Sequence, residues 1–309
     1  MRNKTIIYFT KNRDKYPYTL NALYQAIGIT KQAVHKMLKR HKIDIEKKEY
    51  LNYKIQLMRE EHPTMGVRDL YFKINSICIG RDRFEAFCKE NGYYIRKHKV
   101  FRGTTDSSGV IRFENKIKDI KVTDINQVWQ SDITFFYVAN RFYFITFITD
   151  AYSRVIVGYN VSNHLITEET TLPALKKAIK FRVGKIPKKL IFHSDGGGQY
   201  YDKDFLKLTK KYDMVNSMCK HPWDNGIAER VNGVIKNNYL KHRNIRNYDD
   251  LIKEVDRTVY LYNYEKPHIK LKRLTPIMFE KSITLQKQEK TQNLGKIDVL
   301  KNKKTIKIS

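Results

Sequence analysis

Three acidic residues in the second half of the chain have the types and the order of a metal site for phosphoryl transfer. Asp132 lies inside the β-rich run VWQSDITFFYV, Asp195 ends the apolar run LIFHSD before three glycines, and Glu229 follows the loop WDNG. A carboxylate inside an apolar strand is unfavourable unless something compensates its charge. Either aspartate alone would be interpreted as structural. The order strand-Asp, strand-Asp-Gly and loop-helix-Glu in one region predicts a shared site.

The chemistry expected of these carboxylates is phosphoryl transfer with two metal ions. Oxygen ligands favour Mg²⁺ or Mn²⁺. A pair of such ions, ~3.5–4 Å apart, can activate an attacking oxygen and stabilise a leaving one. Without metal, neighbouring carboxylates repel each other, which raises a pKa. We therefore expect Asp132, Asp195 and Glu229 to be catalytic and to bind two divalent ions, Mg²⁺ with Mn²⁺ as a substitute.

The surrounding sequence predicts a mixed sheet covered by helices. Three β-rich runs, VWQSDITFFYV, RFYFITFIT and RVIVGYNVS, are separated by the turn-like segments ANR and DAYS. They are followed by a helical stretch near 168–182, the strand KLIFHSD, a helix near 202–212, the short strand MVNSMCK and a long helix over 225–242. This succession is typical of a mixed sheet with flanking helices. Two carboxylates on strands and one on a helix can then meet at one edge of the sheet.

The helix over 225–242 should present Glu229 on a face separate from its buried stripe. The apolar stripe consists of Ile227, Val231, Val234 and Ile235. Positions i, i+3 or i+4, and i+7 align on a helix. Glu229 therefore shares a polar face with Asn232 or Gly233 and then with Lys236.

Residues 18–40 have the pattern of a helix-turn-helix. Apolar residues at helical spacing lead to Gly28, which breaks the run, and Thr30 is a good N-cap for the next helix. Two short helices joined by a glycine turn form such a motif. The outward-facing side chains that we expect to read the major groove are Lys31, Gln32, His35, Lys36 and Lys39. The alternative is an ordinary helical hairpin with a solvated basic face.

The composition along the chain divides it into five segments. Residues 1–47 hold the helix-turn-helix, 48–100 hold a second helical DNA-binding unit, and 101–125 form a linker around TTDSSG. Residues 126–285 form the sheet-containing core, and residues 286–309 form a lysine-rich basic tail. The predicted fold class is α+β multidomain, with N-terminal helical units before a mixed sheet and its flanking helices.

Charge and cysteine content restrict the partners and the compartment. The chain has 60 Lys and Arg residues against 32 Asp and Glu residues, a formal net charge of +28. This surplus predicts a polyanionic partner such as DNA, although the lysine bias of an A/T-rich genome contributes to it. The three cysteines are widely spaced without a CxxC pair, which supports neither a zinc site nor disulfides. With no apolar run of ~18 residues and no signal-peptide start, we expect a soluble cytoplasmic protein that does not bind membranes.

Several motifs, in order, resemble those of bacterial insertion-sequence transposases. They are HPTMGVRDLYFKIN, IGRDRFEAFCKENG, WQSDITFF, TDAYSRVIVGY, HSDGGGQYYDKDF, WDNGIAERVNGVIK and YNYEKPHIKLKRLTP. Over residues 48–281 the chain is most similar to the insertion-sequence-three family, whose catalytic domain resembles retroviral integrase. The resemblance implies a ribonuclease H-like integrase catalytic core over residues 126–285, with a DDE-type acidic triad at Asp132, Asp195 and Glu229. It also matches Lys236 to the family's basic position that contacts element-end DNA.

The activity that this resemblance implies is magnesium-dependent DNA transposition. Activated water would cut a strand at the element's end, and the 3′-hydroxyl left there would attack another phosphodiester to join the strands. The helical units would bind terminal inverted repeats, and a homo-oligomer would act on double-stranded end and target DNA at the bacterial nucleoid. One alternative is a DNA-binding regulator with an inactive core, which the intact acidic residues disfavour. Another is a ribonuclease H-like nuclease that only hydrolyses, which the two N-terminal recognition units disfavour.

Other residues near the triad have more ordinary interpretations. Between its second aspartate and its glutamate lie 33 residues (196 to 228), slightly fewer than the family has. The shortening falls in the loop CKHPWDNG, where it should be tolerated. We expect His193 to pack beside or orient the second aspartate, and Asp150 to be a turn residue rather than a fourth ligand. Either Asp224 or Asn225 should cap the following helix.

Overall fold

Two compact units make up the part of the chain that the computed structural model describes. The described residues are 2–74, 79–95, 113–219 and 221–288. The first unit combines Met1–Glu60 with Leu70–Tyr93, and the second combines Glu61–Asp69 with Tyr94–Ser309. Residues 101–112 of the predicted linker and residues 289–309 of the predicted basic tail lie outside the described residues. Within those residues, no helix is both long enough and apolar enough to cross a lipid bilayer.

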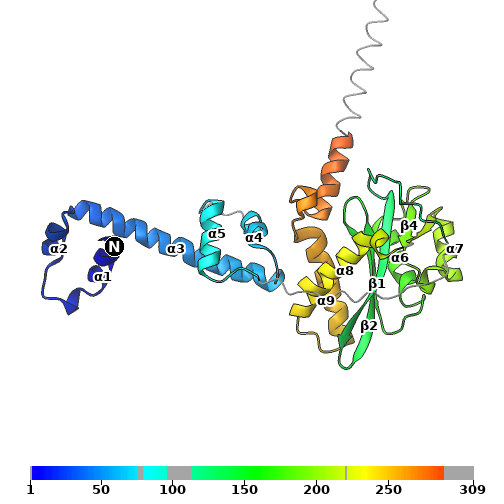
Figure 1. Ribbon diagram of the computed structural model, residues 1–309, viewed down its shortest axis with the longest axis horizontal. Helices are drawn as coiled ribbons and strands as arrows, with labels where there is room; N and C mark the ends of the chain where they lie inside the picture. Colours follow the sequence, from blue (N-terminus) through cyan, green and yellow to red (C-terminus); the bar gives the residue numbers. More distant parts are fainter. Residues whose placement is uncertain (1, 75–78, 96–112, 220, 289–309) are drawn as a thin grey trace, which may run out of the picture. The chain divides into compact units, whose positions relative to one another are not determined.

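The first unit is helical (Figure 1). Its helices are α1 (Arg2–Lys11), α2 (Leu20–Ile27), α3 (Lys31–Glu61), α4 (Val67–Ile74), which enters the unit at Leu70, and α5 (Arg81–Glu90). Between α2 and α3 Gly28 has φ 65°, a left-handed conformation that glycine adopts without strain. The hydroxyl of Thr30 accepts a hydrogen bond from the backbone N–H three residues on, at 3.2 Å. The predicted glycine turn and N-cap are confirmed.

A small apolar cluster holds the first three helices together. It is formed by Ile6 of α1, Tyr24 of α2 and Val34 of α3, all of them buried. The contribution of α1 was not predicted from the sequence. Two short helices alone can bury little apolar surface, and α1 supplies a third apolar side chain against which they pack.

The second helix of the motif is much longer than predicted. It runs for 31 residues, through the predicted domain boundary between residues 47 and 48. The segment HKIDIEKKEY at that boundary has no glycine or proline, and Lys48 pairs with Asp44 one turn earlier at 2.9 Å. Nothing in this segment therefore stops a helix, which ends only shortly before Pro63. The expectation of two short helices is wrong, and the division into domains stays a prediction.

The second half of α3 packs with α5 through a turn at Gly92. This glycine has φ 73°, and the next residue, Tyr93, donates its N–H to the carbonyl of Cys88 at 2.8 Å, as expected for a helix C′ position. Tyr93 also bonds α3 twice: its hydroxyl donates to Asn52 at 2.9 Å, and its carbonyl accepts from Arg59 at 2.9 Å. The predicted helical block after residue 48 is thus built on the same long helix as the helix-turn-helix.

The second unit contains a five-stranded mixed sheet. Its strands are β1 (Val128–Val138), β2 (Arg141–Asp150), β3 (Ile156–Ser162), β4 (Ile191–Ser194) and β5 (Val215–Met218). Their order is β3-β2-β1-β4-β5, with β1–β2 and β2–β3 antiparallel and β1–β4 and β4–β5 parallel. The predicted mixed sheet with flanking helices is confirmed.

Helices cover both faces of this sheet (Figure 1). On one face, α6 (Thr171–Phe181) and α7 (Lys203–Lys211) pack on a buried cluster that includes Trp129. At Gly158 of β3 a Cβ atom would lie 2.3 Å from the carbonyl oxygen of Ala174, so only glycine lets α6 approach this closely.

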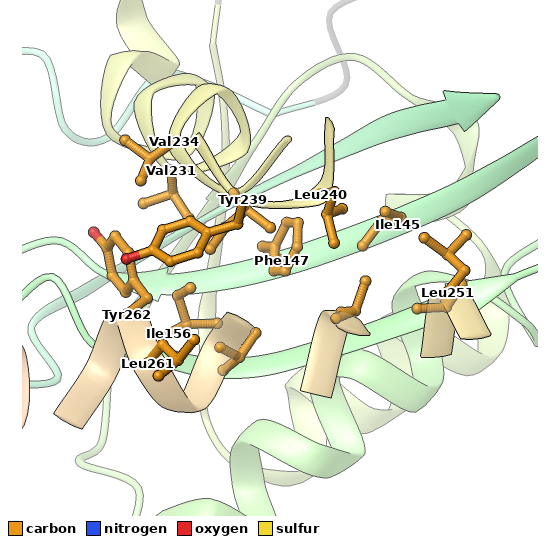
Figure 2. Close-up of a cluster of buried hydrophobic side chains, with 14 of the residues drawn as sticks. Ile145, Phe147, Ile156, Val231, Val234, Tyr239, Leu240, Leu251, Leu261 and Tyr262 are labelled. Atoms are coloured by element: carbon orange, nitrogen blue, oxygen red, sulfur yellow. The ribbon is translucent and has the colours of Figure 1, made fainter. Parts of the chain in front are cut away.

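The other face is covered by α8 (Gly226–Asn238) and α9 (Tyr248–Tyr260). Figure 2 shows side chains of these helices, such as Val231 and Leu251, packed against Ile145 and Phe147 of β2. Helix α8 is shorter than the helix predicted over 225–242, because a 3₁₀ turn over Leu240–His242 follows it.

Strand β1 is central at its start and becomes an edge beyond it. Its parallel pairing with β4 covers only Val128, Trp129 and Gln130. From Ser131 onward, the strand partner that the described residues supply is β2 alone. The stretch that contains Asp132 therefore lies along an edge with no second strand beside it among the described residues, called the open edge below.

Candidate active site

Asp132 is the most perturbed of the three predicted acidic residues. Its Oδ2 accepts a hydrogen bond from the side-chain amide of Asn232 on α8 at 2.7 Å. Burial, followed by the nearby charge of Asp195, raises the pKa of Asp132 to about 7, and Glu229 adds to the same effect. The three predicted residues are therefore electrostatic neighbours, although 97 residues separate the first from the last (229 − 132).

Asp195 follows β4 at its carboxyl end, where the chain must turn sharply. Its Oδ1 accepts the N–H of Gly197 at 3.1 Å, and its carbonyl accepts the hydroxyl of Tyr201 at 3.1 Å. A Cβ atom at Gly196 would lie 2.8 Å from the terminal methyl of Met218, so this flexible side chain packs closely against the turn. Burial raises the pKa of Asp195 above its ordinary value.

Glu229 lies in the first turn of α8, and two side-chain hydrogen bonds attach this turn to β1. Asn225 donates its amide to the carbonyl of Ser131 at 2.8 Å, and Gln130 accepts the N–H of Ile227 at 3.2 Å. The position of Glu229 is thereby tied to the residues directly before Asp132 in β1. The Glu229 side chain itself is exposed.

The predicted cap of α8 is wrong. Asn225 occupies the cap position but makes no capping hydrogen bond, because its amide is bonded to β1. Asp224 instead accepts the N–H of His221 at 3.2 Å and the side-chain amide of Asn115 at 3.1 Å. Gln130, from a distant part of the chain, accepts the N–H that a cap would have bonded.

The donor set formed by the triad fits a hard divalent cation. All three side chains offer carboxylate oxygens, which Mg²⁺ and Mn²⁺ prefer. The pKa of Asp132 is raised by burial and then by the negative charge of Asp195, and a bound cation would offset that charge. Among the described residues, no three His, Cys, Asp or Glu side chains are already gathered tightly enough to enclose one ion. Glu229, exposed and next to the open edge, is the ligand with the most freedom to close such a site.

Lys236 lies two turns after Glu229 and reaches the same edge of the sheet. Its ammonium donates to the hydroxyl of Thr134 at 3.0 Å and lies 4.9 Å from the ring centre of Phe135. Burial lowers its pKa, and the carboxylate of Asp132 opposes this effect. A cation is therefore held beside the carboxylates along the open part of β1.

The five predicted groove-reading side chains lie in the first turns of α3. Lys31, Gln32, His35, Lys36 and Lys39 are all exposed. Val34, on the opposite side of the helix, is fully buried. This arrangement suits a recognition helix, and the contact of these residues with DNA stays a prediction.

His193 and Asp150 have structural roles. His193 is buried, and its Nδ1 lies 2.9 Å from the hydroxyl of Ser217 on β5, so the expected orientation of Asp195 by this histidine is not seen. Burial lowers the pKa of His193 to about 4, which keeps it neutral near pH 7. Asp150 accepts the N–H groups of Tyr152 and Ser153 at 2.9 and 2.8 Å, which confirms it as a turn residue.

Two supporting residues were missed from the sequence. Tyr200 is buried, its hydroxyl lies 2.8 Å from that of Ser131, and its pKa is raised by burial and then by the charges of Asp195 and Asp132. Ser131 in turn donates to the carbonyl of Phe147 at 3.0 Å. The available signal was the polar serine next to Asp132 in an apolar strand, which needs a buried partner.

Comparison with known proteins places this geometry in a family. Two models, each described as an integrase core domain, match residues 123–222 and 211–276. An uncharacterized 31 kDa protein of insertion element IS600 from Shigella sonnei is 29% identical over 223 residues, covering 70% of this chain and 81% of that protein. The two matches together cover residues 123–276, and relatives similar over half or more of the chain come from insertion sequences. The matched residues include Asp132 and Asp195 in the first model and Glu229 in the second.

Other relatives of this chain are similar over shorter stretches. The putative transposase of IS150 from Escherichia coli is 23% identical, covering 60% of this chain and 64% of that protein. The putative transposase of IS986/IS6110 from Mycobacterium tuberculosis is 27% identical, covering 53% of this chain and 60% of that protein. Among solved structures, the HTLV-2 integrase catalytic core in complex with magnesium aligns with a TM-score of 0.41 and 20% identity, covering 50% of this chain and 96% of that one.

Proposed function

We propose that this transposase cuts DNA at the ends of its element and joins the cut strand to a target, using Mg²⁺ held by Asp132, Asp195 and Glu229. The observation that carries the proposal is that the charges of Asp195 and Glu229 act on the buried Asp132, which lies on the part of β1 beyond its pairing with β4. DNA is a long anion, and an edge free of a neighbouring strand gives it access to the carboxylates. Because the site holds only oxygen donors, Mn²⁺ is expected to substitute for Mg²⁺.

The residues of the chain would position the reactants. Bound as a pair, Mg²⁺ ions would activate the attacking oxygen and offset charge on the phosphate. Asn232 fixes the Asp132 carboxylate through their hydrogen bond, and the attachment of α8 to β1 sets the place of Glu229. Lys236 is close enough to the edge to exchange its bond with Thr134 for one to a DNA phosphate.

Two displacements at phosphorus would follow each other. In the first, a water oxygen bonds to phosphorus and the P–O bond to the 3′-oxygen of the element end breaks, leaving a 3′-hydroxyl. In the second, this 3′-oxygen bonds to a target phosphorus, a target P–O bond breaks, and the leaving oxygen takes up a proton. No nucleotide cofactor is needed, since one phosphodiester bond is exchanged for another.

The helical unit would choose the DNA. The exposed residues at the start of α3 would read terminal inverted repeats in the major groove, and the net charge of +28 would hold flanking and target DNA. Because two element ends must be joined to one target, the active form would be a homo-oligomer on DNA. Such a protein would work at the nucleoid in the bacterial cytoplasm.

The test is cleavage of labelled duplex DNA that carries the end of the element flanking this gene. We expect cuts at the end in Mg²⁺ or Mn²⁺, none in a chelator, and a loss of at least about 100-fold in Glu229→Gln. Glu168→Gln, at an exposed glutamate of the same unit, is the matched control and should cut normally. End binding without cutting by the wild type in either metal would overturn the proposal and favour a DNA-binding regulator. Equal cutting of end and random DNA would favour a simple nuclease.

A further inference from the structure

The segment that leads into α8 carries a large side chain that the reaction described above does not use. Trp223 has 73% of its surface exposed, whereas Trp129, the other tryptophan of the chain, is fully buried. Tryptophan is usually well buried, because its large apolar ring is unfavourable in water. An exposed indole six residues before Glu229 therefore calls for a ligand.

The indole is already supported on one face. The ring of His221 stacks on it with a centroid distance of 4.4 Å and an interplanar angle of 15°. A ring that is stacked on one side and 73% exposed offers its remaining surface to a second flat group. DNA bases are flat groups that stack on aromatic side chains whatever their sequence.

The backbone around Trp223 is held in place, so the ring is presented rather than loosely tethered. The segment Pro222–Asn225 forms a 3₁₀ turn, closed by the N–H of Asp224 donating to the carbonyl of His221 at 2.9 Å. The Asp224 carboxylate accepts from the N–H of His221 at 3.2 Å and from Asn115 at 3.1 Å. A fixed ring loses little conformational entropy when it binds a ligand.

The same turn is attached to the candidate active site at both ends. After it, Asn225 donates to the carbonyl of Ser131, the residue before Asp132. Before it, Cys219 donates its N–H to the carbonyl of Ser194, the residue before Asp195, at 2.9 Å. In the sequence, Trp223 thus lies between two residues that bond to the positions directly before Asp195 and Asp132.

We propose that Trp223, backed by His221, is a stacking platform for a DNA base next to the phosphate that is cut. The inference rests on the proposed cleavage of DNA. A base inside a duplex has both faces covered, so the base that Trp223 receives must first leave the stack. Stacking would hold the strand beside the carboxylates and favour cutting where the duplex opens. Because stacking is tolerant of sequence, Trp223 is a positioning residue for the strand and does not select the element.

The first test compares Trp223→Ala and Trp223→Phe with the wild type in single-turnover cleavage of element-end DNA. We expect the alanine variant to cut roughly tenfold or more slowly, as base–aromatic stacking implies, and the phenylalanine variant to keep most of the rate. Tyr264→Ala, which removes one ring of the exposed Tyr260–Tyr264 stack at 5.0 Å in the same unit, is the control and should cut normally. Unchanged emission from buried Trp129 shows that each variant is folded. Equal rates for the alanine variant and the wild type would overturn the proposal.

The second test measures stacking of a DNA base on Trp223 under conditions in which the DNA is not cut. 2-Aminopurine is placed at successive positions across the cut site, in Ca²⁺ or with Glu229→Gln as the background. We expect its emission at one position to change on binding the protein with Trp223 and not with Trp223→Ala. If the wild type fails to cut any end DNA, the proposed function fails, and this probe still decides the stacking. No difference between the proteins at any position, or a DNA-independent loss of self-association in the alanine variant, would overturn it.

Discussion

Burial sets the protonation of several side chains in the core unit. It raises the pKa of Asp132 to about 7, while the hydrogen bond from Asn232 acts in the opposite direction. It lowers the pKa of His193 to about 4 and, with Lys266 acting in the same direction, lowers that of His268 to about 3. Charged forms lose hydration in each case, so a buried acid holds its proton and a buried base releases it. The first effect concerns a proposed metal ligand, and the histidine effects concern the stability of the fold.

His268 should make the folded state sensitive to acid. Its pKa is about 3 in the folded protein and ~6.5 when unfolded, so the unfolded chain binds a proton that the folded one does not. Stability is therefore retained at pH 7 and lost as the pH falls from about 6.5 toward 3. Between pH 7 and pH 5, the wild type should lose about 1–2 kcal/mol more of its free energy of unfolding than His268→Gln does. Urea unfolding at each pH measures this difference. His242→Gln, at an exposed histidine, controls for the loss of a histidine. A constant difference across this range would refute the assignment.

At the scale of elements, the site depends on how α8 is attached to β1. The hydrogen bonds of Gln130 and Asn225 cross between the strand and the first turn of the helix. Packing of Val231 and Ile235 against the sheet holds the rest of the helix (Figure 2 labels Val231). Apolar packing fixes the helix to the face, but it allows small shifts along the sheet. The two polar bonds are directional, so they set where Glu229 lies.

Asn225→Ala should lower activity more than stability. Loss of its bond to Ser131 frees the first turn of α8, and a displacement of ~1 Å at a catalytic group can lower the rate roughly 100-fold. We expect cleavage to fall at least about tenfold while the protein stays folded by circular dichroism. The matched variant is Asn247→Ala, since Asn247 caps α9 by accepting the N–H of Asp250 at 2.9 Å. That variant should lose ~1 kcal/mol of stability and keep its cleavage rate. Similar rates for the two variants would argue against a positioning role for Asn225.

At the scale of the whole molecule, the proposed function divides DNA reading and chemistry between two compact units. The exposed basic side chains at the start of α3 belong to the first unit, and the three carboxylates belong to the second. The general basic surplus of the chain attracts any DNA, whereas reading a sequence needs side chains that reach base edges. Loss of lysines at the start of α3 should therefore lower the preference for one DNA sequence over another. Loss of lysines elsewhere should lower the affinity for all DNA alike.

Lys31, Lys36 and Lys39, changed together to alanine, test this division. We expect the variant to lose most of its preference for element-end over scrambled DNA, because these side chains contact the groove or its phosphates. The control changes three exposed lysines of the second unit, Lys176, Lys180 and Lys185, with the same change of charge. It should weaken binding to both DNAs alike and reduce the salt dependence by ~0.9 per lost phosphate contact. Anisotropy titrations at several salt concentrations measure both quantities, and an equal loss of preference in the two variants would contradict the division.

The sequence by itself determined which residues could do the chemistry and most of the elements that carry them. Asp132, Asp195 and Glu229 stand at strand and helix positions that local periodicity identifies, and Gly28 and Thr30 mark a turn and a cap through their own backbone preferences. These features depend on neighbours within a few residues, so they can be predicted from the sequence alone. The order of the strands was less accessible, because pairing joins segments that are distant in the chain.

Only the tertiary structure decided which polar groups meet. Asn225 was predicted to cap α8, but its amide bonds to β1 and Gln130 takes the helix N–H, since both partners lie about 95 residues away in the chain. His193 was expected to pack beside or orient Asp195; it is buried, and the hydrogen-bond partner that the fold gives its ring is Ser217 of β5. The exposure of Trp223 likewise depends on what the fold leaves uncovered. Side-chain hydrogen bonds and burial depend on distances between elements, and periodicity along the chain does not encode those distances.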